Sequence, residues 1–129
     1  MKSIWRKEKE FELQEKIAEL FGYQRLQPPA MPAWQRPTKN GTEGLAELPE
    51  WPTSMLYAWT LVKIMEENGY VVELHTPSLQ GNQYWVRVAE MKAKHGIVAY
   101  ASGPTMPMAI SAVFIDWRNA HKHYYPNIF

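Results

Sequence analysis

Three runs of alternating apolar and polar residues between residues 70 and 105 give the chain its clearest pattern. The runs 70–76, 83–89 and 97–102 are rich in β-branched and aromatic residues, as half-buried strands are. Turn-forming residues separate the runs, and the connections are too short for a crossover between parallel strands. The pattern therefore predicts a three-stranded antiparallel sheet that leads through Ser102-Gly103-Pro104 into a final helix.

Strand side chains point alternately to opposite sides of a sheet, so the same pattern sorts these residues into two faces. The face expected to pack on helices carries Tyr70, Val72, Leu74, Tyr84, Val86, Val88, Ile97, Ala99 and Ala101. The opposite face, called the outer face below, carries Val71, Glu73, His75, Trp85, Arg87, Val98 and Tyr100. This second set is too apolar for a plain solvent-exposed face and too polar for a second core. It predicts a surface that another element, another subunit or a ligand covers.

Apolar residues spaced three or four apart predict three helices. The first runs from an N-cap at Ser3 to Phe21 and ends at Gly22, with an apolar stripe of Phe11, Leu13, Ile17, Leu20 and Phe21. The second runs from a cap at Thr53 to about Asn68 and ends at Gly69, burying Ala58, Leu61, Val62 and Met65. The third follows a cap at Thr105 and continues to about His121, with Ala109, Ile110, Val113 and Trp117 facing the sheet.

Two of these helices carry a second apolar line. Tyr57 and Ile64 form it on the second helix, and Met108, Ala112 and Ile115 form it on the third. Because one small sheet cannot cover both lines, the pattern predicts a homo-oligomer.

Residues 23–52 differ in composition from the rest, with most of the prolines, a turn-rich segment and two tryptophans, Trp34 and Trp51. This composition predicts a long loop without long helices or central strands. Two roles stay open for the tryptophans: they anchor the loop to the domain, or Trp34 belongs to a lid that closes over a ligand. The expected fold class is α+β, one domain of residues 1–129 with an N-terminal helix (1–22), this loop (23–52), an α-βββ-α core (53–121) and a tail (122–129).

Composition narrows the classes of function. A chain of 129 residues with 46% hydrophobic residues fits one domain with a modest core. The net charge of +1, without a basic cluster, argues against binding DNA or RNA through bulk electrostatics. The absence of cysteine excludes disulfides and suits the cytoplasm, and no signal peptide or membrane segment is expected.

The residue types needed for catalysis stand in no motif. His75, His95, His121 and His123 lack the partners that would activate a nucleophile, and the pair His121 and His123 lacks a third metal ligand at a suitable spacing. We therefore expect no catalytic residues, no metal site and no cofactor.

The chain resembles the phage ABA sandwich domain family, small proteins frequent in phages and prophages. The resemblance rests on the segments 13–23 and 58–66, on the strand Tyr84-Trp85-Val86-Arg87-Val88, and above all on residues 99–110, where an Ala-x-Ala strand enters a helix through Thr-x-Pro-x-Ala-Ile. Ser111 stands where similar proteins often have a cysteine. The resemblance implies the sandwich fold and a phage origin, hence the host cell cytoplasm, and it implies no activity.

Two hypotheses about function remain. In the first, the protein is a non-enzymatic, oligomeric binding module that sequesters a nucleotide-type immune signal. Its ligand-binding residues would be Trp85, Arg87, Tyr100, His75, Thr105 and Trp34, which offer rings for stacking, a cation for phosphate and the free N–H groups of a helix start. In the second, the same aromatic and arginine residues form a subunit or host-protein interface without a small-molecule ligand.

Overall fold

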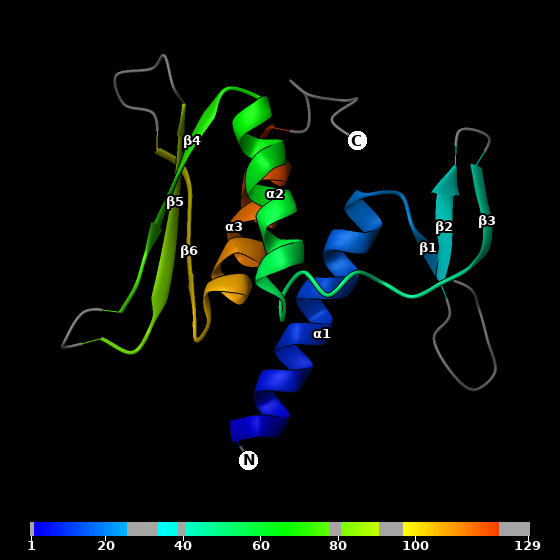
Figure 1. Cartoon of the computed structure of the whole chain (residues 1–129), viewed down its shortest axis with the longest axis horizontal. Helices are drawn as coiled ribbons and strands as arrows, with labels where there is room; N and C mark the ends of the chain where they lie inside the picture. Colours follow the sequence, from blue (N-terminus) through cyan, green and yellow to red (C-terminus); the bar gives the residue numbers. More distant parts are fainter. Residues whose placement is uncertain (1, 26–33, 39–40, 78–80, 91–96, 122–129) are drawn as a thin grey trace.

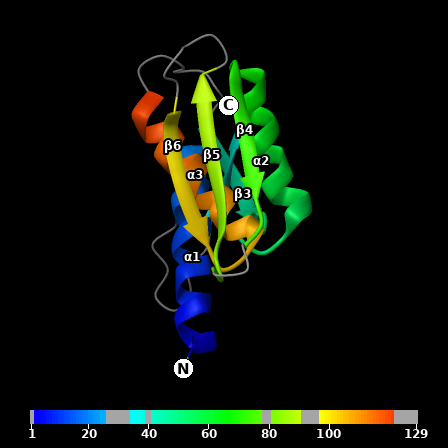
Figure 2. The same ribbon diagram turned by 90° about the vertical axis from the view of Figure 1, so that its left-hand side faces the viewer.

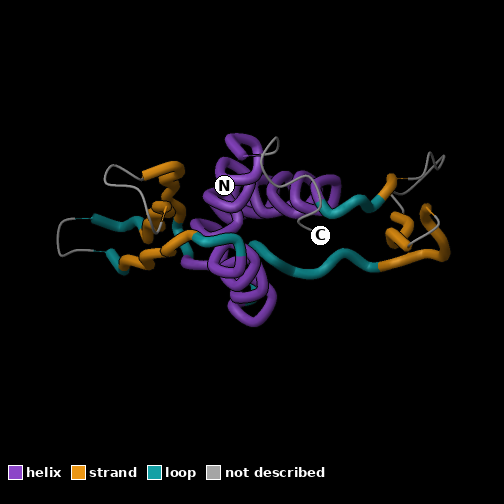
Figure 3. Tube along the Cα trace, turned by 90° about the horizontal axis from the view of Figure 1, so that it is seen from above, coloured by secondary structure: helices purple, strands orange, loops and turns teal. Residues whose placement is uncertain are grey.

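The computed structural model describes residues 2–25, 34–38, 41–77, 81–90 and 97–121. The elements follow in the order α1 (Lys2–Leu20), β1 (Gln24–Arg25), β2 (Trp34–Thr38), β3 (Gly41–Ala46), α2 (Met55–Glu67), β4 (Tyr70–His75), β5 (Tyr84–Glu90), β6 (Ile97–Gly103) and α3 (Met106–His121). Figure 1 shows two sheets at opposite ends of the molecule with the three helices between them. The view from above, in Figure 3, shows the same separation.

The larger sheet is the predicted antiparallel meander, with strand order β4-β5-β6. Tyr70 lies opposite Glu90 on one side of β5, and Tyr84 lies opposite Gly103 on the other. Helices α2 and α3 lie on one face of this sheet, and the outer face is turned away from them (Figure 1 and Figure 2). The α+β fold class, with a three-stranded antiparallel sheet packed against helices, is confirmed.

Helix α3 lies at the centre of the hydrophobic core. The side chains predicted to face the sheet, Ala109, Ile110, Val113 and Trp117, are fully buried, and the Trp117 ring meets Tyr70 of β4 edge to face at 5.5 Å. Because α3 also contacts α1 and α2, Met108 of its expected second apolar line is buried within the chain. Surplus apolar surface therefore remains on α2 rather than on α3, since Met55, Leu56, Tyr57 and Trp59 are exposed.

The helix ends were predicted well on the C-terminal side and less well on the N-terminal side. Gly22 and Gly69 follow α1 and α2 with φ angles of 92° and 90°, a backbone conformation that favours glycine. Ser3, the predicted N-cap of α1, lies inside that helix, which begins at Lys2. The N-cap of α2 is Ser54 rather than Thr53, and its side chain makes no capping hydrogen bond.

Two side chains lie elsewhere than the patterns predicted. Phe11, placed in the apolar stripe of α1, is 64% exposed, because the buried stripe runs through Leu13 and Ile17. Val98, placed on the outer face, packs against the core cluster. The reason is a shift of register between Val88 and Ala89, where Ile97 rather than Val98 lies opposite Ala89, so the alternation breaks at this irregularity.

The stretch predicted as a loop contains a second, smaller antiparallel sheet with strand order β1-β2-β3. Strand β2 is therefore central and contains Pro37, against the expectation for this segment. Proline is tolerated because β1 pairs only with Trp34 and Gln35, so β2 has a strand on one side alone at Pro37. The predicted tail, 122–129, lies outside the described residues.

Both tryptophans of this stretch are anchored in the core, with exposed fractions of 6% for Trp34 and 4% for Trp51. The Trp51 ring stacks on Phe21 at 5.3 Å, and Phe21 stacks in turn on Phe114 of α3 at 5.7 Å. Gln14 of α1 holds the segment before α2 through hydrogen bonds from Nε2 to the carbonyl oxygens of Leu48 (3.2 Å) and Pro49 (2.9 Å). The described part of the stretch is thus attached to the domain, as the anchoring role requires.

Candidate binding face of the sheet

The outer face carries a row of three aromatic rings, one from each strand. Trp85 on the central strand β5 lies directly opposite His75 of β4, and Tyr100 of β6 lies diagonally across from it, opposite Arg87. The His75 ring lies parallel to the Trp85 indole, with centroids 3.5 Å apart and an interplanar angle of 3°. The Tyr100 ring lies 5.5 Å from Trp85 and is tilted by 36°. Both flanks of Trp85 are therefore engaged, and Tyr100, 57% exposed, offers the most accessible ring.

A polar cluster adjoins this row. Arg87 lies opposite Glu73 on one side and opposite Tyr100 on the other. Its Nη2 donates a hydrogen bond to Glu73 Oε2, and the same oxygen lies 3.3 Å from His75 Nε2. Hydrogen bonding by Arg87, and then by His75, holds the pKa of the Glu73 carboxyl below its ordinary value. The three side chains are about equally accessible, with exposed fractions between 36% and 40%.

The structure brings together four of the residues expected to form a site, His75, Trp85, Arg87 and Tyr100, and separates the other two from them. Thr105 caps α3, since its Oγ1 accepts a hydrogen bond from the Met108 N–H at 3.3 Å, and this helix lies on the opposite side of the sheet from the outer face (Figure 1). Trp34 is buried in β2, beyond the helices. Neither residue lies beside Arg87, so a site on the outer face consists of the four residues and Glu73.

Glu73 is the member of the cluster that sequence reasoning did not place in the site. The strand pattern put it on the outer face, but its pairing with Arg87 depends on the register of β4 against β5. The segment between these strands is too long for its length alone to fix that register. The available signal was that Glu73 and Arg87, of opposite charge, both fall on the outer face of neighbouring strands, where opposite charges stabilise a cross-strand pair.

The cluster has a definite chemical character. One carboxylate and one guanidinium neutralise each other, and the indole, imidazole and phenol rings supply flat apolar surface with polar edges. Arg87 keeps further N–H donors for a ligand, because a guanidinium carries five. Such a face can bind a planar polar molecule or the surface of another protein.

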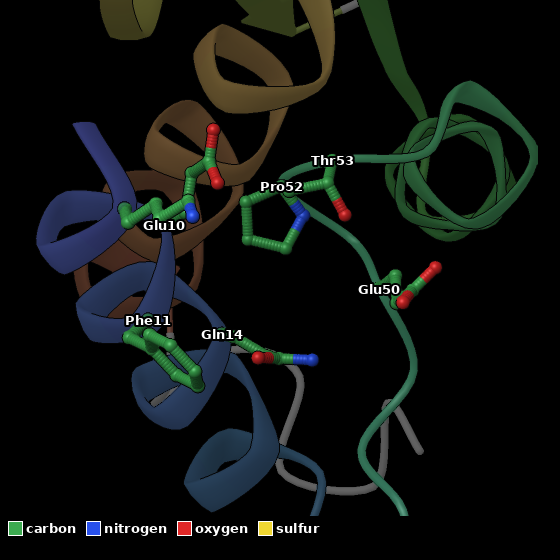
Figure 4. Close-up of a pocket in the computed structure, with 7 residues that line it drawn as sticks. Glu10, Phe11, Gln14, Glu50, Pro52 and Thr53 are labelled. Atoms are coloured by element: carbon green, nitrogen blue, oxygen red, sulfur yellow. The ribbon is translucent and has the colours of Figure 1, made fainter. Parts of the chain in front are cut away.

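A second candidate is a cleft of about 330 Å³ between α1 and the segment before α2. Figure 4 shows Glu10, Phe11 and Gln14 of α1 on one side and Glu50, Pro52 and Thr53 on the other. Its polar groups come mostly from exposed side chains, and Gln14 is already engaged in holding residues 48 and 49. The cleft therefore has fewer preassembled polar contacts to offer than the outer face.

Within the described residues, no group of three or more histidine, aspartate or glutamate side chains is placed to hold a metal ion. The side chains of His95, His121 and His123 lie outside those that the structure describes. None of the helices in the described part combines the length and apolar character that crossing a membrane requires. Comparisons with family models, with curated proteins and with solved structures found no match for this chain.

Proposed function

We propose that this protein is a non-enzymatic binding module that takes its ligand on the outer face of the β4–β6 sheet. The observation that carries the proposal is the preassembled cluster of His75, Trp85, Arg87, Tyr100 and Glu73 on a face that no described helix covers. Strands hold such a constellation more rigidly than loops do, which lowers the entropy lost on binding.

The ligand class that this proposal favours is a nucleotide. The exposed ring of Tyr100 lies directly across from Arg87, so a stacked base and a phosphate have neighbouring partners. The Glu73 carboxylate can accept hydrogen bonds from the amino groups of a base. The resemblance to small phage proteins supports only a location in the host cytoplasm. There, we infer, the protein sequesters a nucleotide signal of bacterial immunity without turning it over.

A second candidate is a protein interface without a small ligand, and a specific observation favours it. Glu73 already neutralises Arg87, and His75 and Tyr100 already flank Trp85. A face whose charges are paired internally costs less to desolvate against another protein than a face with an unpaired cation.

One pair of variants separates these candidates. Arg87→Ala removes the cation of the outer face. Arg25→Ala is the matched control, because Arg25 of β1 also forms an ion pair, with Glu15 of α1 at 3.4 Å, but lies away from the outer face. We expect calorimetric titration with a panel of cyclic and linear nucleotides to identify a ligand that the unchanged protein binds. Its affinity should fall about tenfold or more in Arg87→Ala, because a hydrogen bond to a charged group contributes about 1.5–3 kcal/mol. Arg25→Ala should bind as the unchanged protein does.

Each outcome has a defined meaning. A ligand that chromatography recovers intact after the protein is denatured fits sequestration, whereas a product would contradict a non-enzymatic role. If no nucleotide binds and Arg87→Ala lowers the mass of the assembly, the outer face is a subunit interface instead. If neither affinity nor mass changes, the outer face is not the binding site.

A further inference from the structure

Charge is distributed over the described strands in an unusual way. Strands β1 to β5 each contain at least one arginine or glutamate, including the central strand β5 with Arg87 and Glu90. Strand β6, Ile97–Gly103, contains no charged residue and no proline. It is nevertheless an edge strand of its sheet, paired with β5 alone among the described strands.

An edge strand presents a row of unpaired N–H and C=O groups, and proteins usually protect it with charges, prolines, bulges or a covering element. The bulge of β6 lies at its start, near Ile97, and from Ala99 to Gly103 the ladder is regular. The opposite edge differs in charge, because β4 carries Glu73. The regular part of β6 therefore has the properties of a strand that pairs with another strand.

We propose that two copies of this chain pair through β6, antiparallel across a two-fold axis near Tyr100, and form one continuous six-stranded sheet. A second copy is the occupant that fits, because Tyr100 is the middle residue of the uncharged stretch 98–102 and a two-fold axis there places like side chains opposite each other. Directly opposite aromatic residues stabilise strand pairs, and no charge is brought against a like charge.

The pairing also changes the candidate site. The row His75, Trp85 and Tyr100 would continue into the partner's Tyr100 across the axis, so each outer face gains an aromatic neighbour beside Arg87. This explains why the most exposed ring of the row stands on the edge strand. The shared binding surface rests on the function proposed above, whereas the pairing of β6 does not.

Two lysine substitutions at matched positions test the geometry. Tyr100→Lys places two like charges opposite each other on the β6 axis, and Val71→Lys makes the same change on the same face at the other edge of the sheet. Val71 is 41% exposed and Tyr100 is 57% exposed, so neither change buries a charge. Light scattering over a concentration series should show a dimer for the unchanged protein and for Val71→Lys. The dimer dissociation constant should rise about tenfold or more in Tyr100→Lys.

Cross-linking gives a second measurement that does not depend on weakening the dimer. The chain contains no cysteine, so Tyr100→Cys and Val71→Cys each introduce a single thiol. With a short thiol-reactive cross-linker, Tyr100→Cys should yield a covalent dimer and Val71→Cys should remain a single chain. Thermal unfolding of all four variants checks that each is folded.

Three results would overturn the proposal. The first is a monomer at every concentration. The second is a dimer that both lysine variants dissociate, which would indicate that two outer faces pack on each other. The third is a dimer that neither lysine variant affects. None of these measurements needs a nucleotide, so failure here is distinct from failure of the nucleotide titration.

Discussion

Two glycines of this chain are required for different reasons, and a pair of substitutions at each separates them. At Gly103, where β6 ends, a Cβ atom would lie 3.1 Å from the backbone N of Ala109 and 3.2 Å from Cβ of Met108. At Gly69, after α2, a Cβ atom would meet nothing within 4 Å, but the φ angle is +90°. Gly103 thus permits the close approach of α3 to the sheet, whereas Gly69 permits a backbone conformation.

The expected magnitudes follow from these geometries. Gly103→Ala forces the first turn of α3 away from β6, and overpacking of this kind costs about 1–3 kcal/mol. Gly69→Ala places a residue with a Cβ at positive φ, which costs about 1–2 kcal/mol. Replacing alanine by asparagine shifts the cost in opposite directions at the two sites. It tolerates positive φ better than alanine does, so Gly69→Asn should be milder than Gly69→Ala, while the larger Gly103→Asn should be worse than Gly103→Ala.

Thermal and urea unfolding of the four variants measure these differences, at about 3–6 °C per kcal/mol for a domain of this size. The contrast between alanine and asparagine is the informative quantity, because it cancels errors common to both sites. If Gly103→Asn were no less stable than Gly103→Ala, close packing of α3 against β6 would not be the reason for this glycine.

Two further predictions concern single polar groups. Ser111 is fully buried, and its Oγ has no hydrogen-bond partner among the described residues. Ser111→Ala should therefore raise the free energy of unfolding by up to about 1 kcal/mol in urea unfolding, and a decrease would show that the hydroxyl is satisfied. The Glu73 carboxyl has a pKa lowered by Arg87 and His75, so its contribution to stability is present above its ordinary pKa of 4.5 and is lost as the pH falls through its lowered folded value. Glu73→Gln should lose this part of the dependence of stability on pH in acid. Asp116 contributes in the opposite direction in both proteins, because burial raises its pKa. If the two proteins lost stability identically as the pH fell, Glu73 would not contribute to acid unfolding.

The sequence predicts the larger sheet well, because alternation with period two was strong in all three runs and the packed face had to be apolar. Local features that depend on one residue were harder to predict. Thr53 and Ser54 are adjacent candidates for the same cap, and only the backbone path selects between them. The bulge at Val98 depends on pairing with β5, so no local pattern around Val98 indicated it.

The sequence analysis did not predict the smaller sheet, because proline and glycine are disfavoured in a strand that forms backbone hydrogen bonds with a neighbouring strand on each side. Pro37 is tolerated because β1 is too short to reach it, so only β3 pairs with β2 at this residue. The residues around Pro37 do not show how far β1 extends. For the candidate site, the alternation placed His75, Trp85, Arg87 and Tyr100 on one face, and the structure brings them together there. Thr105 was added for the free N–H groups of a helix start and Trp34 as part of a lid, and neither argument fixes which side of a sheet a residue occupies.

The position of charge in the larger sheet gives the two proposals a common physical basis. The central strand β5 carries Arg87 on its outer face, and the partner that stabilises this guanidinium, Glu73, lies on the edge strand β4. The other edge strand of the described sheet, β6, carries no charge and places Tyr100 next to Arg87. If only solubility mattered, the charges would be expected on β6 and the ring on β5, since edge strands are where charge prevents unwanted pairing. The observed arrangement gives the edge strand β6 no charge that would oppose pairing with a second copy. It also places Glu73, His75 and Arg87 on β4 and β5, where pairing through β6 does not cover them.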